Sequence, residues 1–444
     1  MKLTHIMIAV ASLAGVAQAN ATGIVRLTGS SASSTNVVRG LYNACTTGGG
    51  TTTVYKTSSS TSNLGNQITV ACSKNFDGTT GGTATNEVRI NVAGGSYGAV
   101  SATTTPDNFL VGSASCTAVG NGTGSLSFLS AGQLKNCGTT LADHSLSDGG
   151  YMDVEPPFFG DTNASYFSSG FSQVFGIGVN KALYNDLQAY EKTAAGGSIV
   201  PASCAIGDTT PSCQPSLSKA QIASLINADL FTAKALGGAY LVPASFSGRP
   251  SGYTGTINLG YCMRPQSSGT QQSAQLYFLG YALNGPQGGS EQVIGENVSS
   301  APYFTFLNSG TGNVKNCLND QNADGSAISG APSASTTGYR FGAVSLENNP
   351  VGTSDTWRFV RVQQVEATEG VAGASNTASA LSGRYDDVFE LQAHCADTKC
   401  EDLINNTIYN NVQPGQSSPG IFVTGVESTY SRNGNNSGVY LNRY

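Results

Sequence analysis

Three observations predict an α/β fold with disulfide-closed β-hairpin insertions. Short apolar segments of strand character alternate along the chain with segments of helical spacing, the pattern of a sheet covered by helices. Two polar stretches, residues 46–76 and 103–141, interrupt this alternation and are rich in Gly, Ser and Thr. A cysteine lies at or near each end of both stretches, so disulfides could close them as loops.

The N-terminus has the form of a secretory signal peptide. Lys2 precedes a mostly apolar run over residues 6–16, and residues 17–19 (Ala-Gln-Ala) form a cleavage site of small residues. The apolar run is too short to span a bilayer. We therefore expect residues 1–19 to be removed and the mature protein to be periplasmic or extracellular, without membrane insertion.

Ten cysteines in an exported chain indicate disulfides. Pairing each cysteine with its neighbour in the sequence would close five local loops. Free or metal-bound thiols are disfavoured, since the sequence contains no Cys-x-x-Cys pair and only three histidines, and we expect neither a metal nor a cofactor. The expected pairs are Cys45–Cys72, Cys116–Cys137, Cys204–Cys213, Cys262–Cys317 and Cys395–Cys400.

The composition excludes several classes of function. Charged residues make up only 11% of the chain and the formal net charge is -6, so no clustered basic face is available for nucleic acid. Catalysis by a Ser-His pair is also disfavoured. His144 and His394 are the histidines left after the signal peptide, and both are expected to be structural or solvated. We therefore do not expect an enzyme.

Three turns place small hydroxyl residues between a strand and a helix. This geometry aims backbone N–H groups at one point, where the helix dipole favours an anion. Taken singly, each turn is equally explained by an ordinary Ser or Thr helix cap. The turns are residues 29–34, 95–98 and 268–270, and Arg264 precedes the third with a permanent positive charge. The strands before them are residues 24–28, 87–92 and 256–261, and helical character resumes at residues 35, 99 and 271.

The remaining elements are predicted from periodicity. Residues 217–226 form the best amphipathic helix, with Ser218 as its cap. Residues 284–330 are expected to be loop-like with short strands, and residues 372–382 are a helix or a loop. Further strands are predicted at residues 51–55, 67–71, 173–179, 356–362, 383–391 and 420–424.

A Gly-rich loop over residues 147–156 carries two acids, Asp148 and Asp153. A buried carboxylate can accept the proton of hydrogen phosphate and repels fully ionised sulfate, so it would make an anion site selective. Both acids are candidates for this role. A carboxylate that merely caps its own loop is the alternative.

The order of these features resembles the phosphate-binding proteins of ABC transporters, which have the type II periplasmic-binding fold. The match is patchy but covers most of residues 24–391, and its most specific part is Arg264 followed by Ser268-Gly269-Thr270. Met152-Asp153 stands where the family has a Ser-Asp pair, so the resemblance makes Asp153 the preferred acceptor and Asp148 the weaker one. The resemblance implies a phosphate site made of Ser33, Ser34, Ser96, Asp153, Arg264, Ser268, Gly269 and Thr270.

The resemblance also implies two lobes that close on the ligand. Lobe 1 would comprise residues 20–172 and 389–444, and lobe 2 residues 173–388. We expect a monomeric solute-binding protein that captures phosphate or a related oxyanion, with an ABC permease as its partner in phosphate transport. The alternative is an extracellular or cell-surface structural or adhesion protein that reuses the fold without transport, which low charge and polar insertions equally fit.

Overall fold

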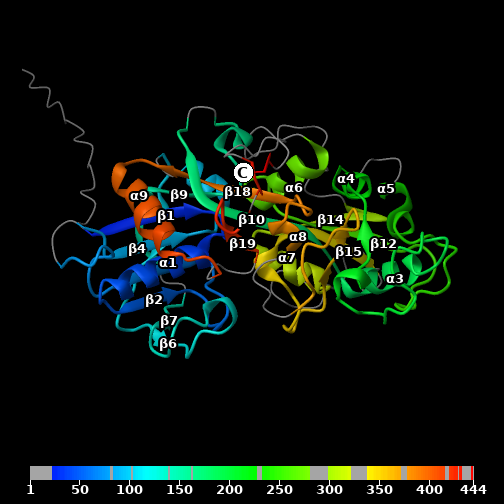
Figure 1. Cartoon of the computed structure of the whole chain (residues 1–444), viewed down its shortest axis with the longest axis horizontal. Helices are drawn as coiled ribbons and strands as arrows, with labels where there is room; N and C mark the ends of the chain where they lie inside the picture. Colours follow the sequence, from blue (N-terminus) through cyan, green and yellow to red (C-terminus); the bar gives the residue numbers. More distant parts are fainter. Residues whose placement is uncertain are drawn as a thin grey trace, which may run out of the picture.

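The computed structural model describes residues 23–80, 84–101, 104–138, 141–161, 164–227, 233–280, 299–321, 338–371, 378–415, 420–428, 430–432 and 442–443. The predicted signal peptide, residues 1–19, lies outside these ranges. Within them the protein has a mixed α/β fold built on one large mixed sheet (Figure 1). No helix in these ranges is both long and apolar enough to cross a bilayer.

The spatial order of the strands in the large sheet differs from their order in the sequence. In order across the sheet its strands are β13 (Ser299–Ser300), β14 (Tyr303–Leu307), β12 (Asn258–Met263), β15 (Gly338–Ser345), β10 (Phe167–Val179), β18 (Val388–Cys395), β9 (Gly149–Met152), β1 (Ile24–Gly29), β4 (Glu87–Asn91), β3 (Gln67–Cys72), β2 (Thr52–Lys56), β7 (Leu134–Asn136) and β6 (Thr117–Ala118). Two more strands, β16 (Arg358–Phe359) and β19 (Ile421–Val423), pair with β10. Smaller sheets pair β5 (Asp107–Leu110) with β8 (Leu141–Ser145), β11 (Ser216–Leu217) with β17 (Arg361–Val362), and β20 (Tyr430–Ser431) with β21 (Asn442–Arg443).

Helices connect many of these strands. They are α1 (Ser34–Thr47), α2 (Ser96–Val100), α3 (Lys181–Glu191), α4 (Lys219–Asn227), α5 (Ala233–Leu236), α6 (Gly269–Leu279), α7 (Thr311–Leu318), α8 (Ala378–Leu381) and α9 (Thr398–Asp402). After α9 the chain remains helical through η7 (Leu403–Ile408) and η8 (Tyr409–Asn411). Short 3₁₀ turns include η2 (Pro156–Phe159) and η6 (Leu346–Asn348).

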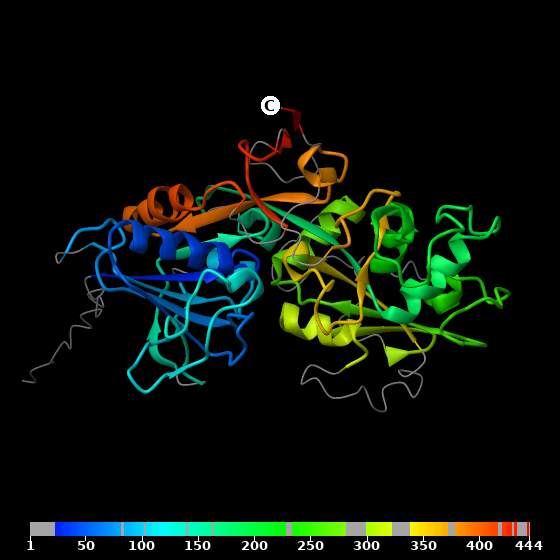
Figure 2. The ribbon, with the colours of Figure 1, turned by 60° about the horizontal axis from the view of Figure 1, so that its bottom comes forward.

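Figures 1 and 2 show two groups of strands and helices side by side. Each group is built around its own hydrophobic core. The first core, around α1, β1 and β4, is built from residues between 25 and 171 and between 391 and 423. The second core, around β12, β15 and α6, is built from residues between 174 and 388 together with Phe422. The boundaries predicted for the lobes, 172/173 and 388/389, fall where the chain passes from one core to the other. The division into lobes of a type II binding protein stays a prediction.

Strands β10 and β18 carry the chain between the two cores. Phe171 of β10 packs in the first core and Val174 in the second. A third cluster, here called the bridging cluster, lies between the cores and takes residues from α2, α6, β10 and β18. Its buried members are Ala99, Val100, Met152, Val154, Phe159, Phe175, Leu276 and Phe389.

Two groups of parallel strands determine where the loops meet. β1 is parallel to both of its neighbours, β4 and β9. β12 is likewise parallel to β14 and β15. Because the carboxyl ends of parallel strands lie at one edge of a sheet, the loops after each group converge, and such edges are where open α/β sheets bind ligands.

All five predicted disulfides are confirmed. Cys45–Cys72 joins α1 to β3, at the two ends of the first polar insertion. Cys116–Cys137 joins the segment before β6 to the residue after β7. Cys262–Cys317 joins β12 to α7 across 55 residues, which anchors α7 beside the strand that leads to Arg264.

The predicted cap of α4 is also confirmed. Gln221 N–H donates to Ser218 Oγ at 3.1 Å, and Ser218 N–H donates to Gln221 Oε1 at 2.8 Å. These reciprocal bonds satisfy two N–H groups that a helix terminus leaves without partners.

Some predicted elements differ from the structure. Residues 311–318 were expected in a loop but form α7, whose buried Val314, Cys317 and Leu318 follow helical spacing. The short strands predicted in the same stretch are present as β13 and β14. Residues 284–298 and 322–330 lie outside the described residues, as do residues 372–377. The strand predicted to begin at residue 383 begins at Val388, because Gly383 adopts φ 71° and turns the chain first. β10 begins six residues earlier than residue 173, at Phe167.

Candidate anion site

The candidate site lies where the carboxyl ends of the two parallel groups face each other. Ser30 and Asp153 directly follow β1 and β9, and Ser96 opens α2 after β4. From the other group, Arg264 directly follows β12, and Thr311 opens α7 after β14. Five residues that are far apart in the sequence are therefore brought to one place.

The first turn uses its hydroxyls in two different ways. Ser30 Oγ donates to the Asp153 carboxylate, and Ser30 N–H donates to Tyr151 O at 2.7 Å. Ser33 and Ser34, the predicted ligands, donate instead to the carbonyls of Ser30 and Ser31, at 3.0 and 2.8 Å. In this conformation Ser30, not Ser33 or Ser34, reaches the acid. A role for Ser33 and Ser34 in binding phosphate stays a prediction.

Asp153 is held from two sides. Its side chain accepts from Ser30, and its own N–H donates to Ser96 Oγ at 3.1 Å. The residue is 3% exposed. Burial raises the pKa of the Asp153 carboxyl, while the hydrogen bond from Ser30, the charge of Arg264 and contact with Ser96 act against that rise.

Arg264 brings a permanent charge into the same region. Its side chain is 5% exposed, and Nη1 donates to Thr311 Oγ1 at 3.1 Å. Its Nε is buried without a hydrogen-bond partner. Burial lowers the pKa of Arg264 to about 10, and the nearby Asp153 carboxylate opposes that shift. An unused donor on a buried cation is unfavourable unless a ligand or water completes it.

The N-terminus of α6 lies in close contact with Asp153. Ser268 is the N-cap and Gly269 the first helical residue, followed by Thr270. A Cβ placed on Gly269 would lie 2.2 Å from Ser96 Oγ and 2.4 Å from Asp153 Oδ2. Only glycine permits this approach. The first N–H groups of a helix have no partner within it and carry its positive dipole end, and here that end adjoins Asp153.

Segments that follow the two groups of parallel strands also contact each other at positions other than Asp153. Tyr97 N–H donates to Ser267 O at 3.1 Å, and Ser31 Oγ lies 3.5 Å from Thr311 Oγ1. Gly95 adopts φ 64°, and a Cβ there would lie 3.0 Å from Ser267 O. The structure is therefore closed across the candidate site.

A second carboxyl group, that of Glu347, interacts electrostatically with Asp153. Glu347 lies in η6 after β15, is half-buried, and accepts from Ser345 Oγ at 3.4 Å. Burial raises the pKa of Glu347 well above its usual range, and the Asp153 carboxylate adds to the rise. Sequence reasoning missed Glu347 because it lies outside every strand–turn–helix unit.

Met152 does not line the site. Its side chain is fully buried in the bridging cluster, which also holds Phe175 and Phe389. Neighbouring residues of a strand point to opposite faces, so a hydroxyl residue at this position would enter an apolar cluster. The apolar side chain is thus explained by packing.

Asp148 lies at the wrong end of β9 for the site. It precedes the strand, and Asp153 follows it, so the two are roughly 16 Å apart along an extended chain. Its carboxylate accepts from Arg26 N–H at 2.7 Å, which fixes the start of β1. The structure therefore assigns Asp148 a structural contact.

Ser96 stands in a pattern that the sequence analysis overlooked. Residues 94–98, Gly-Gly-Ser-Tyr-Gly, fit Gly-x-Ser-x-Gly, the nucleophile elbow of hydrolases, and they lie between a strand and a helix. A hydrolytic Ser also needs a base. The described histidines bond elsewhere: His144 Nδ1 lies 3.1 Å from Asn108 Oδ1, and His394 Nδ1 lies 2.5 Å from Ser165 O. Ser96 instead accepts a bond from the Asp153 backbone.

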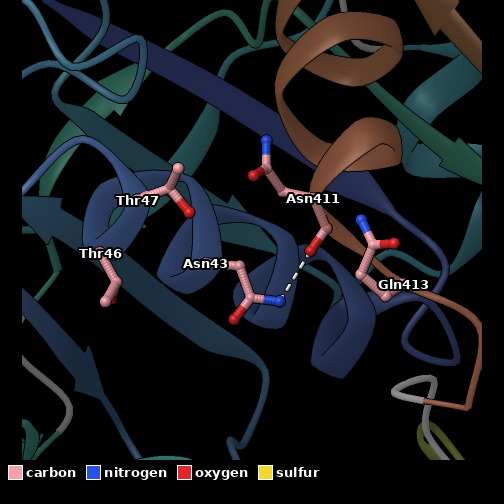
Figure 3. Close-up of a pocket in the computed structure, with 5 residues that line it drawn as sticks. All are labelled: Asn43, Thr46, Thr47, Asn411 and Gln413. Atoms are coloured by element: carbon pink, nitrogen blue, oxygen red, sulfur yellow. Dashed lines mark hydrogen bonds between the residues drawn. The ribbon is translucent and has the colours of Figure 1, made fainter.

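Within the described residues, no group of three or more His, Cys, Asp or Glu side chains is arranged to hold a metal ion. A surface hollow of about 260 Å³ lies at the far end of α1 from the candidate site. Figure 3 shows its polar lining, in which Asn43 Nδ2 donates to Asn411 O at 2.7 Å. It has no charged lining residue.

Comparison of the chain with protein-family models, curated proteins and solved structures finds no significant match.

Proposed function

We propose that this protein is a secreted solute-binding protein that captures phosphate, or a related oxyanion, in a cleft between two lobes of a type II periplasmic-binding fold. One observation carries the proposal. Arg264, buried with an unused donor, lies beside Asp153 and the N-terminus of α6 at the meeting edge of two parallel strand groups. Cation, helix terminus and buried acid together match the chemistry of a partly protonated oxyanion.

Arg264 supports an anionic ligand. Its Nη1 is bonded to a neutral hydroxyl, and none of the ion pairs found among the described residues includes it. A hydrogen bond to a charged group contributes roughly 1.5–3 kcal/mol, so an oxyanion that accepts from Nε would offset part of the cost of burying the guanidinium.

Asp153 supports an oxyanion that carries a proton. A carboxylate in this position repels an anion unless one of the two groups holds a proton for a hydrogen bond between them. Hydrogen phosphate has such a proton at neutral pH and sulfate does not. The protein's net charge of -6 is no obstacle, because nearby fixed dipoles act more strongly than distant, screened charges.

The five confirmed disulfides fit the oxidising compartment that the proposal requires. Uptake through an ABC permease is part of the proposal for a periplasmic protein. Co-purification with a permease would support this role. Recovery of the protein from spent medium would favour the extracellular structural or adhesive alternative.

Equilibrium dialysis tests the proposal directly. The mature protein, stripped of bound ligand by partial unfolding with its disulfides intact, should bind inorganic phosphate. An equimolar amount of sulfate should not displace it. If the parent protein shows no phosphate binding under these conditions, the transport proposal is wrong and the structural or adhesive alternative takes its place.

A further inference from the structure

Thr311 reaches the candidate site from residues 284–330, the stretch that the sequence predicts to be loop-like. It is the first residue of α7, and its N-cap is Gly310, which offers no side chain to the helix terminus. The disulfide Cys262–Cys317 fixes α7 to β12, the strand that ends one residue before Arg264. The position of Thr311 relative to Arg264 is thus covalently restrained.

Two contacts of Thr311 connect the two sides of the site. On its own side, Thr311 Oγ1 accepts from Arg264 Nη1 at 3.1 Å. Across the site it lies 3.5 Å from Ser31 Oγ, a residue 280 positions away in the sequence. Ser31 and Thr311 are both half-buried, whereas Asp153 and Arg264 are buried. The hydroxyl pair therefore lies at the rim, outside the buried groups.

In this arrangement the Thr311 hydroxyl both contacts Ser31 across the site and accepts a hydrogen bond from Arg264. When it accepts from Arg264, its own proton remains available to Ser31 or to a ligand oxygen. A guanidinium held at one Nη by a fixed acceptor has fewer orientations, so its unused Nε points in a defined direction. Opening the site would separate Thr311 from Ser31 and leave the contact with Arg264 intact.

We infer that Thr311 is a positioning residue: its hydroxyl orients Arg264 toward the bound oxyanion and, through Ser31, closes the rim of the site and slows ligand release. The ligand part of this inference rests on the proposed function. The closing contact does not, because it joins two side chains of the protein itself.

The test compares Thr311→Val with Thr311→Ser. Valine keeps the shape and removes the hydroxyl, and serine keeps the hydroxyl. With inorganic phosphate as the probe, Thr311→Val should raise the dissociation rate about tenfold and change the association rate less than about twofold. Thr311→Ser should behave as the parent protein. Thr46→Val, near the C-terminus of α1 and away from the site, is the control for the loss of a hydrogen-bonded Thr hydroxyl elsewhere on a helix.

Amide hydrogen exchange of the ligand-free protein provides the second readout. Tyr97 N–H bonds across the site to Ser267 O, so its exchange reports opening. Thr311→Val should speed exchange at Tyr97 severalfold, with no change at Tyr184, whose N–H bonds to Asn180 O inside the second core. Thr311→Ser should leave both amides protected as in the parent.

The outcomes separate the two proposals. If the parent binds no phosphate but Thr311→Val speeds exchange at Tyr97, the function is wrong and the closing role of Thr311 is supported. If the parent binds phosphate and Thr311→Val changes neither the dissociation rate nor Tyr97 exchange, the inference about Thr311 is overturned. Equally faster amide exchange at Tyr97 and Tyr184 in Thr311→Val would also overturn the inference. The Thr311 hydroxyl would then stabilise the whole protein and not the closed site in particular.

Discussion

The hydroxyl of Ser30 donates a hydrogen bond to the carboxylate of Asp153, which lies 123 residues further along the chain. Both residues directly follow parallel, adjacent strands, so the contact is a consequence of the order of strands in the sheet. Since Arg264 approaches from the other parallel group, a buried acid and a buried cation influence each other without forming one of the described ion pairs. A ligand that bonds to both would complete the arrangement.

Replacing Asp153 by Asn should reduce selectivity more than affinity. The amide keeps the size of the side chain and an oxygen for Ser30, but it no longer repels a fully ionised anion. We expect the ratio of sulfate to phosphate dissociation constants to fall by about tenfold or more, with a smaller change in the phosphate constant. Competition dialysis measures both. Asp148→Asn, at the other end of β9, should change neither constant, and a fall in selectivity there would contradict the assignment.

Substitutions of Arg264 should distinguish its role in phosphate binding from its role in the stability of the fold. Arg264→Ala should weaken phosphate binding by orders of magnitude, because the permanent charge of the site is lost. Arg264→Met fills the same space with apolar atoms and also removes the buried, unused Nε donor. The free energy of unfolding of the ligand-free methionine variant should therefore equal or exceed that of the parent in urea denaturation. A large loss of stability in the methionine variant would show that Arg264 is needed by the fold.

A methyl group on Gly269 should keep the two sides of the site apart. The added Cβ would lie 2.2 Å from Ser96 Oγ and 2.4 Å from Asp153 Oδ2, distances that real side chains do not tolerate. Gly269→Ala should lower phosphate affinity at least about tenfold while α6 itself gains helix propensity. Gly312→Ala, where an added Cβ meets nothing within 4 Å, is the matched control in α7. Titration calorimetry on both variants distinguishes the steric effect from a general effect of alanine.

Local patterns sufficed for much of the fold. The five disulfides were predictable because each links neighbouring cysteines, and the cap of α4 because Ser218 and Gln221 lie three residues apart. Both depend on short stretches of chain. The α/β character followed in the same way from alternating strands and helices. That most strands join one large mixed sheet was not predicted.

The remaining contacts depend on how distant segments pack. Which serine of the first turn reaches Asp153 is determined by where β1 ends, at Gly29, and this makes Ser30 the contact in place of Ser33 or Ser34. Thr311 was missed because its glycine-containing segment has weak helix propensity, although Val314, Cys317 and Leu318 carried the helical spacing. No periodicity marks Glu347, since its proximity to the site arises entirely from tertiary packing.

Stability should fall as the pH rises, in part through Asp387. This side chain is 1% exposed, and its Oδ1 has no hydrogen-bond partner. Burial raises the pKa of Asp387 to about 8, with a further rise from Asp386 that Arg432 and Lys219 oppose. In the unfolded chain the same carboxyl titrates near its ordinary value of about 3.9. Between these two values the folded protein holds a proton that the unfolded chain has released.

The direction in which stability changes with pH follows from that difference in bound protons. The stabilising contribution of protonated Asp387 is fully present below about pH 4 and is lost as the pH rises through about 8. Within this window the free energy of unfolding should fall by about 1.4 kcal/mol per pH unit for this group alone. Asp387→Asn should remove that slope, as urea denaturation from pH 5 to 9 will show. A slope from Glu191, whose pKa burial also raises to about 8, should remain in the variant. An unchanged total slope would mean that Asp387 is already ionised in the folded protein at pH 5.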